Sequence, residues 1–159
     1  MNSFSAKLST RNVPELDERD RSAFIMRHTL EKTPWEFPPE ITADPEDFQY
    51  QTKFEYEMEL HNVRKLDIWV PATAAWIRIN PRGLYQMAVE ERPMYTERDW
   101  IPTNWKGKKG WSKERWAFWI ERFEAIGGIP ELEEKSRELA REAASSMRRV
   151  EADGGVWCY

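Results

Sequence analysis

The amino-acid sequence predicts an all-α fold, a single compact helical domain of about five helices with a long ordered loop. Apolar residues recur at helical spacing along several segments, and prolines and glycines stand where helices begin or end. A length of 159 residues is typical of one hydrophobic core. We therefore expect a flexible N-terminus over residues 1–13, the helical domain over 14–151 and a C-terminal tail over 152–159.

The front of the domain is predicted to contain two helices joined by an ordered linker. Apolar spacing predicts the first helix from Pro14 to Lys32, and the three prolines within residues 33–39 prevent its continuation. The second helix is expected to start at Asp44-Pro45, where a side-chain acceptor precedes a proline at the first helical position, and to fade near His61.

A third helix is predicted to start at Pro71, because proline fits the first turn of a helix better than its interior. Asn80-Pro81 should end or kink this helix, and residues 83–87 should add another helical turn or two. The apolar run over residues 65–70 leaves a short strand as the competing prediction.

The clearest predicted helix follows a long connection over residues 90–110. Ser112 is a favourable N-cap, Trp111 and Trp116 are placed for a hydrophobic staple, and Gly127-Gly128 should stop the helix. One apolar stripe runs along it, formed by Trp116, Trp119, Ile120 and Phe123. The last helix is predicted to begin at Pro130, with acidic residues in its first turn and basic residues in its last.

Composition and charge exclude several classes of function. The net charge of −4 comes from 24 basic and 28 acidic residues that are mixed along the chain, so we expect no nucleic-acid partner. The single cysteine, Cys158, cannot form a disulfide within one chain. No apolar run has the length of a membrane span, and residues 1–13 lack a signal peptide's apolar core. These features predict a cytoplasmic protein without a membrane partner.

Several segments resemble a known domain family. The segments are Ile68 to Ile77, Asn104 to Trp119, Arg122-Phe123 and Ala140 to Met147. They resemble fungal proteins of the uncharacterised family DUF3632 over roughly residues 65–151, although the front of this chain is shorter than we expect for members. The resemblance implies a fungal, α-helical, intracellular protein, and it implies no reaction.

The sequence contains only weak candidates for catalytic groups. Glu57 and His61 lie one helical turn apart and could join a base to an orienting carboxylate, and Glu59 is a nearby acid that could move a proton. An exposed ion pair explains such spacing more often, and the same holds for His28 and Glu31. No metal-binding spacing and no cofactor motif is found, so we expect neither a metal nor a cofactor.

Two basic features near the predicted Ser112 helix have a functional and a structural interpretation. The lysines of residues 106–110 could hold an anion, although a basic solvated turn is more frequent. Arg115 could stack on an indole ring or hold a carboxylate from a neighbouring helix. For Arg115, too, the structural interpretation is favoured.

Nine tryptophans are the outstanding feature of the composition, because each buried indole N–H needs an acceptor. Our first hypothesis is a pocket for an apolar or cationic small molecule, lined by Trp69, Trp76, Tyr85, Trp105 and Trp116. Such a protein would bind a ligand or act as a cofactor-independent enzyme, of isomerase or cyclase type, on an apolar metabolite. The alternative is a non-catalytic interaction or self-association module that uses exposed aromatics and could form a homo-oligomer. Packing rules leave Trp105 unexplained.

Overall fold

A computed structural model describes residues 6–7, 10, 19–31, 57–58, 60–95 and 103–154. Its helices are α2 (Arg19–Leu30), α4 (Leu66–Ile79), α5 (Pro81–Val89), α6 (Lys113–Gly127) and α7 (Glu134–Ala152). Over these described ranges no residue belongs to a strand, which confirms the predicted all-α class. Much of the predicted second helix, the start of the first and the end of the tail lie outside the described residues.

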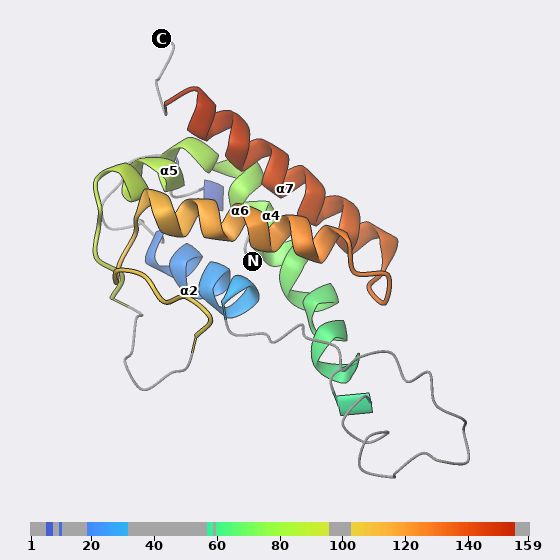
Figure 1. The fold of residues 1–159 in the computed structure, drawn as a ribbon. Helices are drawn as coiled ribbons and strands as arrows, with labels where there is room; N and C mark the ends of the chain where they lie inside the picture. The colour runs from blue at the N-terminus through green and yellow to red at the C-terminus, as the bar shows by residue number, and fades with distance from the viewer. Residues whose placement is uncertain are drawn as a thin grey trace, which may run out of the picture.

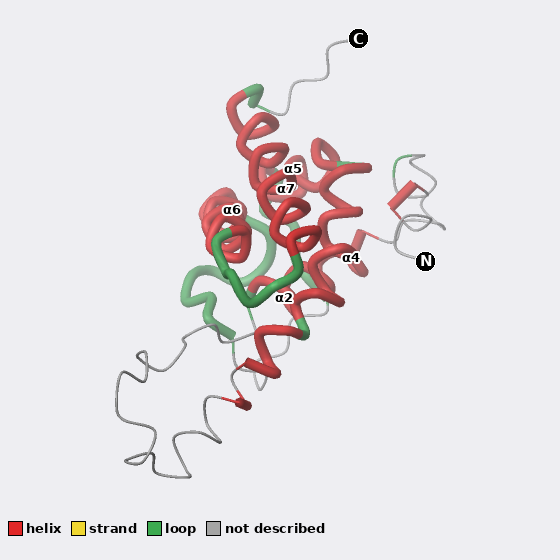
Figure 2. Tube along the Cα trace, turned by 90° about the vertical axis from the view of Figure 1, so that its right-hand side faces the viewer, coloured by secondary structure: helices red, strands yellow, loops and turns green. Residues whose placement is uncertain are grey.

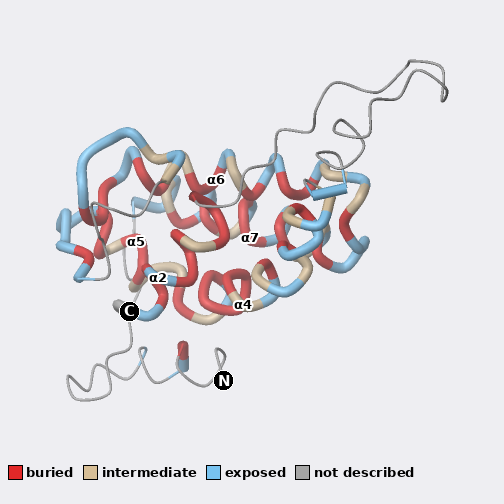
Figure 3. Tube along the Cα trace, turned by 90° about the horizontal axis from the view of Figure 1, so that it is seen from below, coloured by how far each residue is buried: buried red, intermediate tan, exposed pale blue. Residues whose placement is uncertain are grey.

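The helices enclose a core from several sides. Helix α7 packs against both α4 and α6, and α2 packs against the same two helices from another side (Figure 1 and Figure 2). Helix α5 follows α4 directly and contacts α6 and α7. Buried residues gather where these helices face one another (Figure 3). None of the helices in the described part of the chain has the length and apolar composition needed to cross a membrane.

Helix α6 forms as its local signals predict. The hydroxyl of Ser112 accepts a hydrogen bond from the backbone N–H of Arg115 at 3.1 Å, which satisfies a free donor of the first turn. Its apolar stripe is buried, with Trp116, Trp119 and Phe123 fully inaccessible. The helix ends at Gly127, and Gly128 is its C-cap. A Cβ atom at Gly127 would lie 2.7 Å from Cγ of Arg141, so the close approach of α7 favours glycine there.

Helix α4 begins earlier than predicted. It starts at Leu66 and continues through Pro71, so both the predicted start at Pro71 and the competing strand are wrong. Proline removes one helical hydrogen bond, and Pro71 is exposed within α4. The flanking residues Leu66 and Val70 are fully buried, and burial of this apolar run holds the helix together.

Helices α5 and α7 also start at other residues than expected. Helix α5 begins at Pro81 and has 9 residues, because the Asn80 side chain caps it by accepting from the N–H of Gly83 at 3.2 Å. Helix α7 begins at Glu134 and not at Pro130. Leu132 is buried in the turn that precedes the helix, and this burial keeps residues 130–133 outside the helix.

A buried pair of hydroxyl groups joins α2 to α4. Oγ1 of Thr29 and Oγ1 of Thr73 lie 2.7 Å apart, so one hydroxyl donates to the other, and the accepting hydroxyl donates to a backbone carbonyl of its own helix. Because both threonines are fully buried, the pair satisfies polar groups that would otherwise be costly. The pair fixes how α2 lies against α4.

Candidate functional site

A buried carboxylate at the end of α2 organises one side of the molecule. Oε1 and Oε2 of Glu31 accept from Nε and Nη2 of Arg115 at 2.7 and 2.8 Å, in a bidentate pair. The indole N–H of Trp119 donates to Oε1 at 2.8 Å, and Nε of Arg27 lies 3.4 Å from Oε2. We call these four residues the Glu31 cluster. Glu31 and Arg115 are both fully buried, so the charges are stable there only because they are paired.

Further hydrogen bonds join the cluster to the loop before α6 and hold the end of α2. Nη1 of Arg115 donates to the carbonyl of Gly110 at 2.9 Å, which ties the loop before α6 to the cluster. The carbonyl of Glu31 accepts from the N–H of Asn104 at 2.8 Å, and Nε of Arg122 donates to the carbonyl of Leu30 at 3.0 Å. The end of α2 is thereby attached to both α6 and the preceding loop.

Trp105 covers this cluster from the loop. The guanidinium of Arg115 lies 5.5 Å from the centre of the Trp105 ring, within the range of a cation–π contact. The Trp105 ring also packs on Phe118 at 5.4 Å, and its indole N–H donates to the carbonyl of Lys108 at 2.8 Å. A Cβ at Gly107 would lie 2.2 Å from the Trp105 ring, so this glycine gives the ring its place. Packing and hydrogen bonding therefore account for Trp105.

The residues of the predicted aromatic pocket lie in different surroundings. Trp76 and Trp116 are fully buried, and the Tyr85 ring meets Trp116 edge-on at 5.2 Å. Trp69 is half-buried, and its ring lies against the imidazole of His28 at 4.1 Å. Tyr85 and Trp116 are the pair that these contacts join, whereas the Trp105 ring contacts Arg115 of the Glu31 cluster. Burial, followed by the nearby Glu151 charge, raises the pKa of Tyr85.

The weak catalytic candidates gain no organised site. His61 and Glu57 are both exposed, and no ion pair joins these two described side chains. Glu59 lies outside the described residues. The expectation of an exposed pair between His28 and Glu31 is wrong, because Glu31 is buried against Arg115. Among the described residues no three histidine, cysteine or acidic side chains form a group that could hold a metal ion.

The lysines of the loop over residues 106–110 make internal contacts. Nζ of Lys106 donates to the carbonyl of Thr103 at 3.1 Å, and Nζ of Lys108 pairs with the carboxylate of Glu91. The hydrogen bond to Glu91 raises the pKa of Lys108. These contacts describe a solvated basic turn that is tied to its neighbours.

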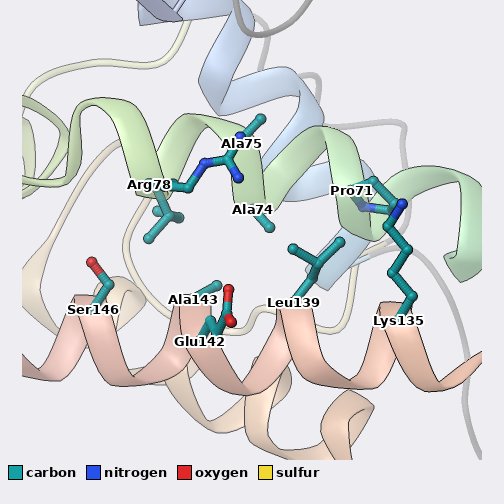
Figure 4. Close-up of a pocket in the computed structure, with 10 residues that line it drawn as sticks. Pro71, Ala74, Ala75, Arg78, Lys135, Leu139, Glu142, Ala143 and Ser146 are labelled. Atoms are coloured by element: carbon teal, nitrogen blue, oxygen red, sulfur yellow. The ribbon is translucent and has the colours of Figure 1, made fainter.

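A groove between α4 and α7 is hollowed into the surface (Figure 4). Its volume is about 340 Å³. Helix α4 contributes Pro71, Ala74, Ala75, Ile77 and Arg78, and α7 contributes Lys135, Leu139, Glu142, Ala143 and Ser146. The groove exists because small side chains face each other where the two helices pack, so the space between the helices is left unfilled. We call it the α4–α7 groove.

Three charged groups stand around the apolar floor of the α4–α7 groove. Arg78 and Glu142 lie on opposite walls, and Lys135 lies toward the Pro71 end (Figure 4). All three side chains are exposed. Among the residues that the structure describes, none of the three has an ion-pair partner within 4.0 Å. An apolar floor with unpaired charges at its rim is an arrangement that can bind an amphipathic ligand.

Two signals in the sequence pointed toward these features. Arg27 and Glu31 are one turn apart, and both follow Ala23 at four-residue spacing on the face of α2 that enters the core. That register indicates burial of Glu31. The α4–α7 groove had a weaker signal, the small residues of the 72–75 segment, because its second wall comes from a distant part of the chain.

In the part of the chain that the structure describes, the fold and the site define a helical protein with a buried ion-pair cluster and an amphipathic surface groove. The sequence pattern of the family DUF3632, proteins of unknown function, matches residues 1–123, and the chain belongs to this family. The resemblance was therefore identified correctly but placed wrongly at residues 65–151, since the match includes the whole front of the chain. No curated protein and no solved structure matches the chain. The Glu31 cluster lies inside the matched part, whereas α7 lies beyond it.

Proposed function

We propose that this protein binds a small, largely apolar molecule in the α4–α7 groove. The observation that supports this proposal best is the groove itself, an apolar floor of about 340 Å³ with unpaired polar groups at its rim. Ligand pockets typically have volumes of about 300–1,000 Å³ and are lined mainly by apolar groups with a few polar ones. The α4–α7 groove has both properties.

The proposal keeps the class of function that the tryptophan count favoured and places the site elsewhere. Of the six tryptophans that the structure describes, four are almost fully buried, namely Trp76, Trp111, Trp116 and Trp119. None of the six lines the α4–α7 groove. In this proposal the indole rings stabilise the domain, and α4 and α7 supply the binding surface. The ligand would meet the protein in the cytoplasm, where the sequence predicts it to be.

Filling the groove tests the proposal. The probe is octan-1-ol, and the measurement is the change in backbone amide shifts on titration, followed by two-dimensional NMR. We expect shifts concentrated along α4 and α7. Ala143→Leu should abolish them, because Ala143 is 4 % exposed and forms part of the floor. The matched control is Ala125→Leu on the exposed side of α6, which should leave the binding unchanged.

A second filling variant separates blocked binding from a damaged fold, since overpacking costs about 1–3 kcal/mol. Ser146 is half-buried at the rim, and Ser146→Leu should weaken binding while leaving the circular dichroism and the melting temperature unchanged. The proposal fails if octan-1-ol shifts no groove residue, or if well-folded Ser146→Leu and Ala143→Leu bind it as tightly as the wild-type chain.

A different observation favours the alternative, an interaction or self-association module. Ile68 on α4 is 73 % exposed and Tyr95 is 76 % exposed. Aromatic side chains such as that of Tyr95 are enriched at protein interfaces. Sedimentation equilibrium tests this function: an interaction module should show a mass that rises with concentration and falls again with Ile68→Ser. A monomer at all concentrations would remove the self-association reading.

A further inference from the structure

The α4–α7 groove carries information about the charge of its ligand. We propose that the ligand is an amphipathic organic anion, whose acidic group binds Arg78 and whose apolar body lies on the alanine-lined floor. This inference rests on the proposed function and adds the chemical class of the ligand. Three features of the groove support this ligand class: the absence of an ion pair at Arg78 among the described residues, the polar and charged groups on the groove walls, and the length of the apolar floor.

Arg78 differs from several other surface arginines in its ion pairing. Many surface arginines of this protein are engaged: Arg82 pairs with Asp153, Arg141 with Glu134 and Arg148 with Glu124. Arg78 is exposed in the α4–α7 groove and has no ion pair with any described side chain. A guanidinium offers a planar fork of donors that matches a carboxylate or a sulfate. An acidic head group would supply the acceptors that Arg78 lacks.

The walls of the groove place a hydroxyl group and charged groups around its floor. Ser146 lies toward the Arg78 end, and its hydroxyl can donate a further hydrogen bond to an anion (Figure 4). Glu142 stands on the wall opposite Arg78, so its carboxylate opposes an anion in the middle of the groove. Lys135 at the far end makes the total of the lining charges positive, with two cations against one carboxylate. The charge of the whole lining therefore favours an anion.

The apolar floor of the groove can accommodate the apolar body of such a ligand. Pro71 and Arg78 are seven residues apart on α4, which corresponds to roughly 10 Å along a helix with a rise of about 1.5 Å per residue. Leu139 and Ala143 of α7 line this length with apolar surface. A medium-length alkyl chain or a compact ring system fits such a floor while its head group remains at Arg78.

Three probes with one alkyl chain and different head groups test the inference. They are octanoate, octan-1-ol and octyltrimethylammonium, and calorimetry at low salt gives each dissociation constant. We expect octanoate to bind about tenfold tighter than octan-1-ol, because its carboxylate can accept hydrogen bonds from the Arg78 guanidinium. The cationic probe should bind most weakly. Shortening octanoate to hexanoate should weaken binding roughly tenfold, because two methylene groups leave the floor.

Two single substitutions should act in opposite directions. Arg78→Gln should weaken octanoate binding about tenfold and leave octan-1-ol binding unchanged. Glu142→Gln should strengthen octanoate binding several-fold, since it removes the opposing charge. The control is Arg149→Gln, the same change on α7 at an exposed position outside the α4–α7 groove, which should alter neither probe.

The outcomes separate the two proposals. If octanoate and octan-1-ol bind equally, and Arg78→Gln changes neither while Ala143→Leu abolishes both, the anion assignment is overturned and the binding groove stands. If none of the three probes binds at α4 and α7, the proposed function itself fails. Stronger binding of octyltrimethylammonium than of octanoate would assign the groove to a cation and reject the inference.

Discussion

The two sides of this molecule place charged groups beside apolar surface in opposite ways. In the Glu31 cluster, the carboxylate and the Arg115 guanidinium are fully buried and bonded to each other. In the α4–α7 groove, Arg78, Lys135 and Glu142 are exposed, and none has an ion-pair partner among the described residues. A charge that is buried and paired holds helices together, whereas a charge that is exposed and unpaired is available to a ligand.

The Glu31 cluster and the α4–α7 groove also differ in their position relative to the stretch that matches the family. The cluster joins α2 to α6, and all its residues lie within the stretch that matches the family. The groove uses α4, which lies within that stretch, and α7, which lies beyond it. The variants below test whether stability belongs to the first region and binding to the second.

The largest effect is expected from breaking the Glu31 cluster. Glu31→Gln should lower the free energy of unfolding by about 3–5 kcal/mol, because Arg115 would be left buried without a compensating charge. Urea denaturation followed by circular dichroism measures this change. Glu124→Gln is the matched control, because it breaks an exposed pair with Arg148, and it should leave the midpoint nearly unchanged. Equal effects of the two variants would contradict the structural role of the cluster.

Trp116 in the core and Trp105 in the loop before α6 should differ in their effect on stability. Trp116→Ala should cost about 3–5 kcal/mol, because the ring is fully buried and its removal leaves a cavity. Trp105→Ala should cost about 1–2 kcal/mol, because this half-buried ring loses its contacts with Phe118 and Arg115 and its hydrogen bond to the carbonyl of Lys108. Thermal unfolding of both variants measures the difference. A loss for Trp105→Ala as large as that for Trp116→Ala would show that the loop belongs to the core.

A smaller effect is expected at high pH from Tyr85. Burial raises its pKa above the ordinary value of 10.0, so the folded state keeps the proton that the unfolded chain releases. The resulting stability is complete below pH 10 and is lost as the pH rises through the folded-state pKa. Tyr85→Phe should therefore change stability little at pH 7 and flatten the decline above pH 10. Urea midpoints across that range provide the measurement, and parallel curves for both proteins would refute the expectation.

The smallest effect on stability is expected in the α4–α7 groove. Arg78→Gln and Glu142→Gln should each change the free energy of unfolding by less than about 0.5 kcal/mol, because both side chains are exposed and unpaired with any described residue. The same denaturation experiment measures them beside Glu31→Gln. A loss of several kcal/mol would show that these charges support the fold, and it would remove the contrast between the two regions.

Local signals explain which parts of the fold the sequence predicts. Helix α6 was predicted with its cap, its buried stripe and its stop, because Ser112 and Gly127-Gly128 act through neighbouring residues. Pro71 misled the prediction of α4, because burial of the preceding apolar run outweighs the hydrogen bond that proline removes. Pro130 misled the start of α7 in a similar way, since Leu132 is held in the core before the helix begins.

The candidate site depends on contacts that no single segment encodes. A carboxylate from a neighbouring helix is one of the two partners that the sequence allows for Arg115, and its identity required the packing of α2 against α6. Glu31 was instead interpreted with His28, whose imidazole lies against Trp69. The α4–α7 groove depends on how closely two distant helices approach, and helix periodicity does not contain that distance. The residues predicted to line one aromatic pocket lie in different surroundings in the structure. Tyr85 contacts Trp116, whereas Trp69 contacts His28 and Trp105 contacts Arg115.

The burial of the indole rings has a spectroscopic consequence. The Trp119 indole N–H is bonded to a carboxylate, and Trp105 lies over a guanidinium, so both chromophores sense the electric field of the Glu31 cluster. None of the described indoles lines the α4–α7 groove. The fluorescence emission of Trp119 and Trp105 should therefore report whether α2 stays attached to α6. Ligand binding in the groove is better detected by NMR of isotope-labelled alanine methyl groups on its floor, namely those of Ala74, Ala75 and Ala143.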